Sequence, residues 1–231
     1  MIQFGSDKIK EIYVGSDKIK EVYHGSDLVW SGKKPSYAIL TNGTRVNFEL
    51  GNTPMSNFEV DSRSVTLNGT SYLKYLIKEI TFEISYENVT SIGNNFLNGF
   101  SSLLSIDLSV FVNVTSIGDY FMRDCGIIKT IDLSAFTNVT SIGDYFMIYC
   151  IDFETIDLSA FTNVTSIGDY FIAECWKLST LIIGSTVPPT LGSAAIGGCP
   201  IQNIYVPAQS VNAYKAATNW NVYASKISAI W

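Results

Sequence analysis

The segment IDLSVFVNVTSIGDYFMRDC, from Ile106 to Cys125, decides how this sequence is organised, because it returns at a constant step of 25 residues. Its hexapeptide Asn-Val-Thr-Ser-Ile-Gly begins at Asn88, Asn113, Asn138 and Asn163. A cysteine closes three copies and a shorter later copy, at Cys125, Cys150, Cys175 and Cys199. A fixed period of this length predicts a solenoid, in which each copy forms one turn and contacts only its neighbours.

Each copy begins with a strand motif. The spacing Leu103-x-x-Ile106-x-Leu108 is typical of the strand of a leucine-rich repeat, and it returns in the next two copies. Alternation along a strand predicts that Ile106 and Leu108 face the core and that Asp107 faces solvent. Stacked copies would therefore form a column of parallel strands.

A second polar position follows each hexapeptide. Its residues all belong to the set that caps helix N-termini: Asn94, Asp119, Asp144, Asp169 and Ser193. We therefore predict that Gly118-Asp119-Tyr120-Phe121 forms a turn. Asp119 would be the N-cap of a short helix-like segment that ends near Cys125.

The period divides the chain into four regions. Residues 1–32 are predicted to form a small antiparallel β-meander, and residues 33–79 a linker and an N-terminal solenoid cap. Residues 80–199 form the solenoid with its parallel strand column, and residues 200–231 the C-terminal cap. In this last region Ser210 is expected to cap a short helix, which a final strand follows.

The N-terminal region has a shorter repeat of its own. Gly-Ser-Asp occurs at Gly5, Gly15 and Gly25 and separates short runs rich in Ile, Val and Tyr, which predicts three or four strands. These runs resemble the short repeats near the N-termini of tail-associated proteins of phages and prophages from gut and Gram-positive bacteria. The resemblance implies an attachment module, which would contact other virion or surface proteins through residues 1–32.

The solenoid region resembles a known family. Where ordinary leucine-rich repeats place Asn or Cys after the strand, this chain has Phe111, Phe136 and Phe161. That departure, with Thr-Ser-Ile-Gly-Asp-Tyr-Phe followed by a cysteine, resembles the BspA-like leucine-rich repeats of bacterial surface proteins. The stretch Ile204-Tyr205-Val206-Pro207 and the residues after it resemble the terminal cap of that family. The resemblance implies a stacked, curved solenoid and, commonly, adhesion.

Composition excludes some partners. The net charge is −6 and the isoelectric point about 4.7, so a nucleic-acid partner is not expected. No apolar run is long enough for a membrane helix, so we expect no membrane insertion. The N-terminus lacks the features of a signal peptide, which predicts either a leader removed from the chain or exit from the cell by another route, such as lysis.

The cysteines invite a disulfide or zinc interpretation, but a linear column cannot surround a tetrahedral metal ion. Phe100 takes the cysteine position in the first copy, which indicates an apolar packing slot. We predict buried free thiols and neither metal nor cofactor. With the aromatic residues that follow the hexapeptides, they would form a structural ladder of Cys125, Cys150, Cys175, Cys199, Phe121, Phe146 and Phe171.

The aspartates of the strand motif, Asp107, Asp132 and Asp157, are the candidate ligand-binding residues. They should project from one face about 5 Å apart, where like charges oppose one another. One interpretation is structural, since exposed Asp keeps a solenoid soluble and Ser109, Ser134 and Ser159 lie near enough to hydrogen-bond. The other is a stripe that binds a cation or a polar ligand.

Catalysis has little support in the sequence. His24 is the only histidine, and its place in the short repeat indicates a residue on a strand surface, so a Ser-His-Asp triad within one chain is nearly excluded. Paired carboxylates would permit glycoside hydrolysis, but every candidate lies on a repeated surface, which suits binding better than a single catalytic site.

We therefore predict a non-enzymatic recognition or adhesion protein. The leading hypothesis is a virion-associated protein of a phage or prophage, which binds a host-surface glycan or protein through its solenoid. A secreted or cell-surface bacterial adhesin and a tail-associated polysaccharide depolymerase are the alternatives. The ligand and the oligomeric state, including a homo-oligomer, stay open.

Overall fold

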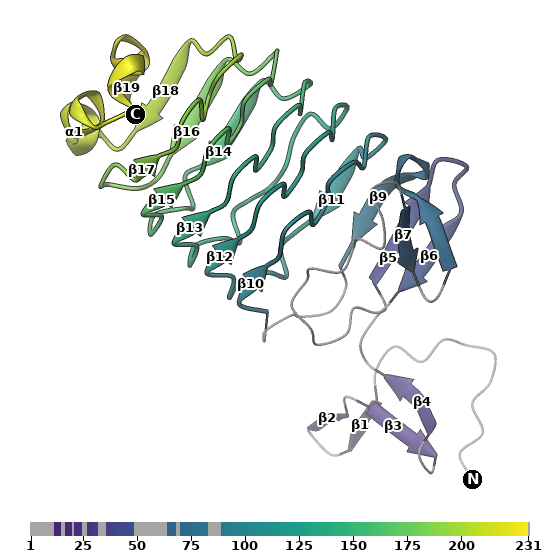
Figure 1. Ribbon diagram of the computed structural model, residues 1–231. Helices are drawn as coiled ribbons and strands as arrows, with labels where there is room; N and C mark the ends of the chain where they lie inside the picture. Colours follow the sequence, from purple (N-terminus) through teal and green to yellow (C-terminus); the bar gives the residue numbers. More distant parts are fainter. Residues whose placement is uncertain are drawn as a thin grey trace.

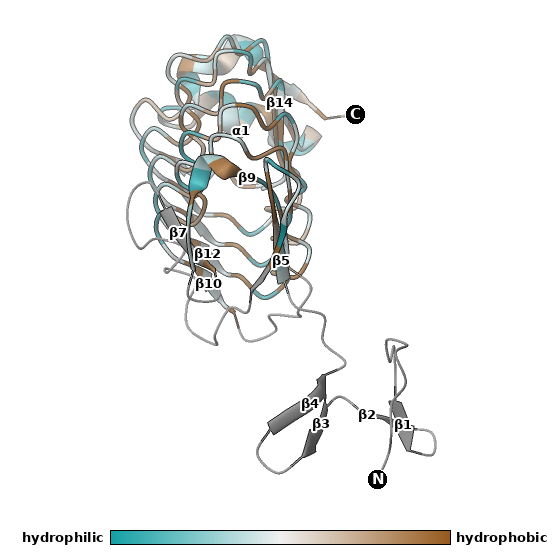
Figure 2. Ribbon diagram, turned by 90° about the vertical axis from the view of Figure 1, so that its right-hand side faces the viewer, coloured by the Kyte–Doolittle hydropathy of each residue, from teal (hydrophilic) through white to brown (hydrophobic). Residues whose placement is uncertain are grey.

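A computed structural model describes residues 12–14, 17–19, 21–24, 27–31, 36–48, 64–67, 70–82 and 89–230. Over residues 89–230 the chain runs as stacked turns (Figure 1). Two columns of parallel strands lie on opposite walls of the stack, as Figure 2 shows. The predicted repeat solenoid is therefore confirmed.

The hexapeptide supplies the first column. Its Ser-Ile step or the equivalent residues form β10 (Ser91–Ile92), β12 (Ser116–Ile117), β13 (Ser141–Ile142), β15 (Ser166–Ile167) and β17 (Thr190–Leu191). These strands pair in parallel and in register, with isoleucine beside isoleucine up to Leu191. The isoleucines are buried and so join each turn to the next within the core.

The leucine-rich motif supplies the second column, as predicted. Its strands are β9 (Ile77–Thr81), β11 (Ser105–Asp107), β14 (Thr155–Leu158), β16 (Thr180–Ile183), β18 (Asn203–Val206) and β19 (Ile227–Ala229). β9 pairs with β11, while β14, β16, β18 and β19 form a continuous parallel sheet. In β14, Ile156 and Leu158 are buried and Asp157 is exposed, as the alternation requires.

An antiparallel hairpin extends the second column at its N-terminal end. β5 (Ser36–Leu40) pairs with β9 on one side and with β6 (Arg45–Phe48) on the other. β7 (Ser64–Leu67) pairs with β8 (Thr70–Leu73), and a 3-10 turn, η1 (Lys74–Leu76), leads into β9. The hairpin covers the edge of β9, which would otherwise expose unpaired backbone groups.

The N-terminal region contains the predicted antiparallel strands, but as two hairpins rather than one meander. β1 (Ile12–Val14) pairs with β2 (Asp17–Ile19), and β3 (Glu21–His24) pairs with β4 (Asp27–Ser31). No pairing joins β2 to β3 among the described strands. A single residue separates these two strands in the sequence, whereas the tight turns of hairpins have at least two residues. The start of the predicted meander, residues 1–11, lies outside the described residues.

The third side of each turn is irregular. Residues 119–124 form turns and no helix, so the predicted helix-like segment is wrong. Tyr120 and Asp124 have left-handed backbones, with φ of 57° and 60°. Their N–H groups donate to the carbonyls of Asp144 and Ile148 in the next turn, at 2.9 and 3.1 Å. Because these donors bond between turns, they cannot close a helix along their own chain.

The predicted aromatic ladder is present in the core. Ring centroids are 5.6 Å apart between Phe96 and Phe121, 4.9 Å between Phe121 and Phe146, and 5.2 Å between Phe146 and Phe171. All four rings are stacked and buried. Each turn thus covers the flat apolar surface of the turn before it, which no single copy could do alone.

The cysteines are free, and three of the four are fully buried. Their packing role was predicted; their hydrogen bonds were not. Each thiol donates to a carbonyl of the preceding turn, as Cys150 does to Met122 at 2.9 Å and Cys175 to Met147 at 3.1 Å. The thiols therefore satisfy carbonyls that face the interior, where an unpaired acceptor would be costly.

The C-terminal cap closes the last turn with polar side chains. Its elements are η2 (Ala208–Ser210), α1 (Val211–Ala216), η3 (Asn221–Lys226) and β19. Ser210 precedes α1 but makes no side-chain cap, so that prediction is wrong; its hydroxyl donates instead to the carbonyl of Thr186 at 2.6 Å. Tyr214 and Trp220 likewise donate to the carbonyls of Ser185 and Pro189, each at 2.8 Å.

Burial should protect the thiol column from alkylation. Burial raises the pKa of Cys125 from its ordinary 9.0 to about 12, so this thiol stays protonated near neutral pH. With iodoacetamide at about pH 8, we expect mass spectrometry of the folded protein to show Cys199, which is only half-buried, alkylated first. All four thiols should react in denaturant. Rapid native alkylation of Cys125 or Cys150 would contradict the buried column.

Candidate functional site

The aspartates of the leucine-rich motif form one exposed column on the wall built by the second strand column, which we call the second wall. The Oδ1 atoms of Asp107, Asp132 and Asp157 accept hydrogen bonds from the N–H groups of the serines two residues later, at 2.9, 2.9 and 2.8 Å. These serines are Ser109, Ser134 and Ser159. The predicted hydrogen bonding is therefore present, and each aspartate closes a local turn of its own copy.

Only two of these aspartates share a site. Asp132 and Asp157 line one surface hollow of about 340 Å³, with Thr130 and Ser159 among the other residues of its wall, and Asp107 lies outside it. The hydroxyl and the N–H of Ser134 lower the pKa of Asp132. This carboxylate therefore stays ionised and is an acceptor for a polar ligand.

The strand column is interrupted beside this hollow. Residues 130–133 carry the strand motif, yet they form no strand, and no backbone hydrogen bond joins residues 129–132 to the turns on either side within residues 89–230. Ile106 and Ile131 are half-exposed here, whereas Ile156 and Leu181 in the equivalent positions are fully buried. The wall is thus open at one place, where the backbone groups of residues 129–132 have no partner in a neighbouring turn of the described chain. We call residues 129–133 the ladder opening.

A second hollow, of about 350 Å³, lies on the other side of Thr130. Its lining combines both charges with hydroxyl groups: Lys129, Thr130, Asp152, Glu154, Thr155 and Lys177. Lys177 Nζ lies 2.5 Å from Asp152 Oδ1, and this contact raises the pKa of the lysine and lowers that of the aspartate. Sequence reasoning missed this hollow, because its charged residues lie at repeat positions where the residue type changes from copy to copy, as from Lys129 to Glu154 and from Asp152 to Lys177.

The other polar column, Asp119, Asp144 and Asp169, has a role different from the predicted helix cap. Each Oδ1 accepts the backbone N–H of the equivalent residue in the next turn, at 2.9 Å to Asp144, 2.7 Å to Asp169 and 2.6 Å to Ser193. Asn94 does the same for Asp119 at 2.9 Å. These side chains therefore join turns to one another.

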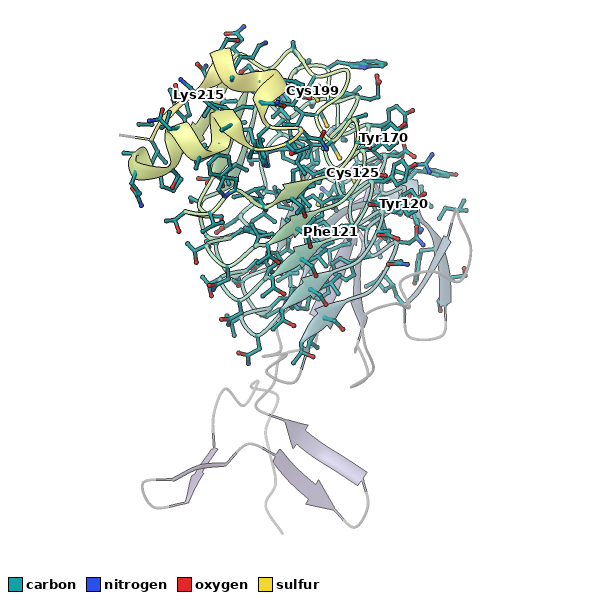
Figure 3. The ribbon with its side chains drawn as sticks, turned by 60° about the vertical axis from the view of Figure 1, so that its left-hand side comes forward. Tyr120, Phe121, Cys125, Tyr170, Cys199 and Lys215 are labelled. Carbon is teal, nitrogen blue, oxygen red and sulfur yellow. The ribbon has the colours of Figure 1, made fainter. Side chains whose placement is uncertain are left out.

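A tyrosine column lies beside it on the surface. The rings of Tyr120, Tyr145 and Tyr170 are nearly parallel, with centroids 4.7 and 5.1 Å apart. Figure 3 shows Tyr120 and Tyr170 on one flank of the stack. Since each inner ring face is covered by its neighbour, this column mainly stabilises the stack.

The described residues contain neither a metal-binding cluster nor a membrane-spanning helix. No group of three or more His, Cys, Asp or Glu side chains lies close enough to hold a metal ion in the part of the chain that the structure describes. Over the same ranges, no helix combines the length and apolar character that crossing a membrane requires.

Comparison with known families agrees with this geometry. The family model described as the BspA type leucine rich repeat region matches residues 65–202, in six copies. The match spans more than half of the chain and includes both strand columns from β10 to β17. This chain belongs to the BspA-type leucine-rich-repeat family. Membership favours recognition or adhesion over catalysis.

Three solved chains match this BspA-type chain, and one of them is a cell surface protein. That match is the crystal structure of a leucine rich cell surface protein from Faecalibacterium prausnitzii A2-165, with 17% sequence identity and a TM-score of 0.34. The similarity covers 97% of this chain and 56% of that chain, so this protein spans little more than half of the other. No curated protein matches the sequence.

The aspartate bonds between turns should contribute measurably to stability. Asp144→Ala leaves the N–H of Asp169 without its acceptor, and we expect a loss of about 1–3 kcal/mol in the free energy of unfolding by urea. Asp144→Asn retains an acceptor oxygen, as Asn94 does naturally, and should be nearly neutral. An equal loss in both variants would show that the carboxylate charge, and not the hydrogen bond, matters here.

The ladder opening should be visible in hydrogen exchange. Amides in residues 129–133 lack partners in neighbouring turns, so we expect them to exchange at least about tenfold faster than those of residues 155–158. Peptides covering 129–134 and 154–159 provide the comparison, since both contain the motif Ile-Asp-Leu-Ser. Equal protection of the two peptides would mean that the ladder is closed in solution.

Proposed function

We propose that this BspA-type protein is a non-enzymatic recognition protein that binds a polar ligand on a host-cell surface through the second wall of its solenoid. The observation that carries the proposal is the ladder opening with a hollow on each side of Thr130. A rigid stack holds these hollows in place, so little conformational entropy is lost when a ligand binds. Asp132 and Asp157 are the proposed ligand-binding residues, with Asp107 as an extension of their column.

The electrostatics of the hollow favour binding over hydrolysis. A glycosidase needs one carboxylic acid with a raised pKa beside a carboxylate. The pKa of Asp132 is lowered instead, because Ser134 hydrogen-bonds to its ionised form. Asp132 and Asp157 are both exposed, whereas the acid of a glycosidase lies in a pocket that excludes water.

In this proposal, the N-terminal region attaches the protein to a larger assembly and so determines where it is located. Residues 1–32 attach the solenoid to other proteins of a phage or prophage virion, and the solenoid then contacts a host glycan or protein. Attachment to a bacterial cell surface, or secretion, is the alternative, and it agrees with the surface setting of the BspA-like family. Proteomics of virions induced from the source strain, compared with its cell-wall fraction, separates the two locations.

The recognition role can be tested with the full chain, fluorescently labelled and incubated with intact cells of a panel of gut and Gram-positive bacteria. We expect retention on some cells and weaker retention of the double variant Asp132→Asn, Asp157→Asn. Val187→Ala is the control, because this side chain is exposed outside both hollows. Absence of retention on every cell would contradict recognition. Release of reducing ends from the cells would indicate a depolymerase instead.

A further inference from the structure

The three central repeats differ from one another mainly in one short segment. Residues 131–146 and 156–171 are identical, and residues 106–121 differ from them at two positions. The following segments diverge almost completely: Met-Arg-Asp-Cys-Gly-Ile-Ile-Lys, Met-Ile-Tyr-Cys-Ile-Asp-Phe-Glu and Ile-Ala-Glu-Cys-Trp-Lys-Leu-Ser. The identical parts contain the strand, the phenylalanines and the aspartates that join the turns. Stacking therefore constrains those parts, while the exposed positions of the divergent segment are free to serve another purpose.

These divergent positions come together at the second hollow. Four of its six lining residues belong to the divergent segment, namely Lys129, Asp152, Glu154 and Lys177. Repeated threonines, Thr130 and Thr155, complete the lining. The hollow thus combines residues whose type does not repeat with two repeated threonines, and it borders the ladder opening. A single site of this kind can be specific for one ligand, which a uniform column cannot.

The chemistry of the lining indicates an uncharged ligand rich in hydroxyl groups. Two lysines and two carboxylates cancel in charge, so the hollow does not favour an ion of either sign. Its carboxylates accept hydrogen bonds, its ammonium groups donate them, and its threonines do both. The backbone of the ladder opening adds further donors and acceptors. A sugar presents paired donors and acceptors of the same kind on successive carbons.

An exposed tryptophan, which is not itself one of the lining residues, is the sequence neighbour of Lys177. Trp176 directly precedes Lys177 and is 61% exposed, in the place where earlier copies have Gly126 and Ile151. Its indole N–H donates to Glu174 Oε2 at 3.0 Å, which fixes the ring. An exposed tryptophan held in one orientation offers a flat apolar surface, and the C–H groups of a sugar ring can pack on such a surface.

An added peptide strand fits this place less well. Strand addition requires a free sheet edge with room for a neighbour at about 4.8 Å. The ladder opening lies between turns that carry β11 and β14, so the positions on both of its sides are already occupied by the chain itself. Hydroxyl groups of a sugar can reach the exposed backbone groups from the solvent side.

We propose that the hollow formed by Lys129, Thr130, Asp152, Glu154, Thr155 and Lys177, together with Trp176, is a binding site for an uncharged glycan built of hexose or N-acetylhexosamine units. The site rests on the recognition role proposed above and names its ligand class and its specific residues. Asp132 and Asp157 lie on the far side of Thr130 and extend the same surface.

The test is isothermal titration of the full chain with neutral hexasaccharides of glucose, mannose, galactose and N-acetylglucosamine. We expect at least one to bind, and Trp176→Ala and Glu154→Ala each to weaken that binding about tenfold. Both side chains are on the surface, so melting temperatures should stay near that of the parent chain. Val187→Ala should bind as the parent chain does.

The outcomes separate this site from the wider role. Retention on cells without binding of any neutral hexasaccharide would overturn the glycan site and leave recognition standing. The same holds if a hexasaccharide binds equally to the parent chain and to both variants. Loss of cell retention on protease treatment of the cells, with no hexasaccharide bound, would indicate a protein ligand instead.

Discussion

Hydrogen bonding between consecutive turns is the constraint on which the whole molecule depends. Because one 25-residue copy has no partner strand of its own, its backbone donors and acceptors must be satisfied by the copies before and after it. Two parallel strand columns do this on the walls. On the irregular side, aspartate carboxylates accept N–H groups of the next turn, and cysteine thiols donate to carbonyls of the preceding turn.

The same constraint explains both ends of the stack. At the C-terminal end no further turn follows, and the hydroxyls of Ser210 and Tyr214 and the indole of Trp220 replace it as donors. At the other end the hairpin of β5 and β6 covers β9. The ladder opening at residues 129–133 is the exception along the second wall. Unpaired backbone at one place on an otherwise satisfied wall is the kind of local inconsistency that functional sites show.

Several expectations drawn from the sequence changed for one reason. Asp119 and Ser210 are good helix caps by residue type, but neither caps a helix with its side chain, because each bonds to another turn. Cys150 was expected only to fill space, and it also donates a hydrogen bond to Met122. In a stack, the partner one turn away competes with local partners, and residue type alone does not show which partner is bound.

The sequence by itself determined the period, the leucine-rich strand column, the buried phenylalanine and cysteine ladders and the exposure of Asp157. All of these follow from apolar residues that recur at one step, since such residues can be buried only by stacking. The tertiary structure alone decided where the column opens and that Lys129, Asp152, Glu154 and Lys177 line one hollow. Lys129 and Glu154 share one repeat position, and Asp152 and Lys177 share another, but the residue type changes at each. No repeated motif therefore marks them, and only the stacking of the turns brings them together in space.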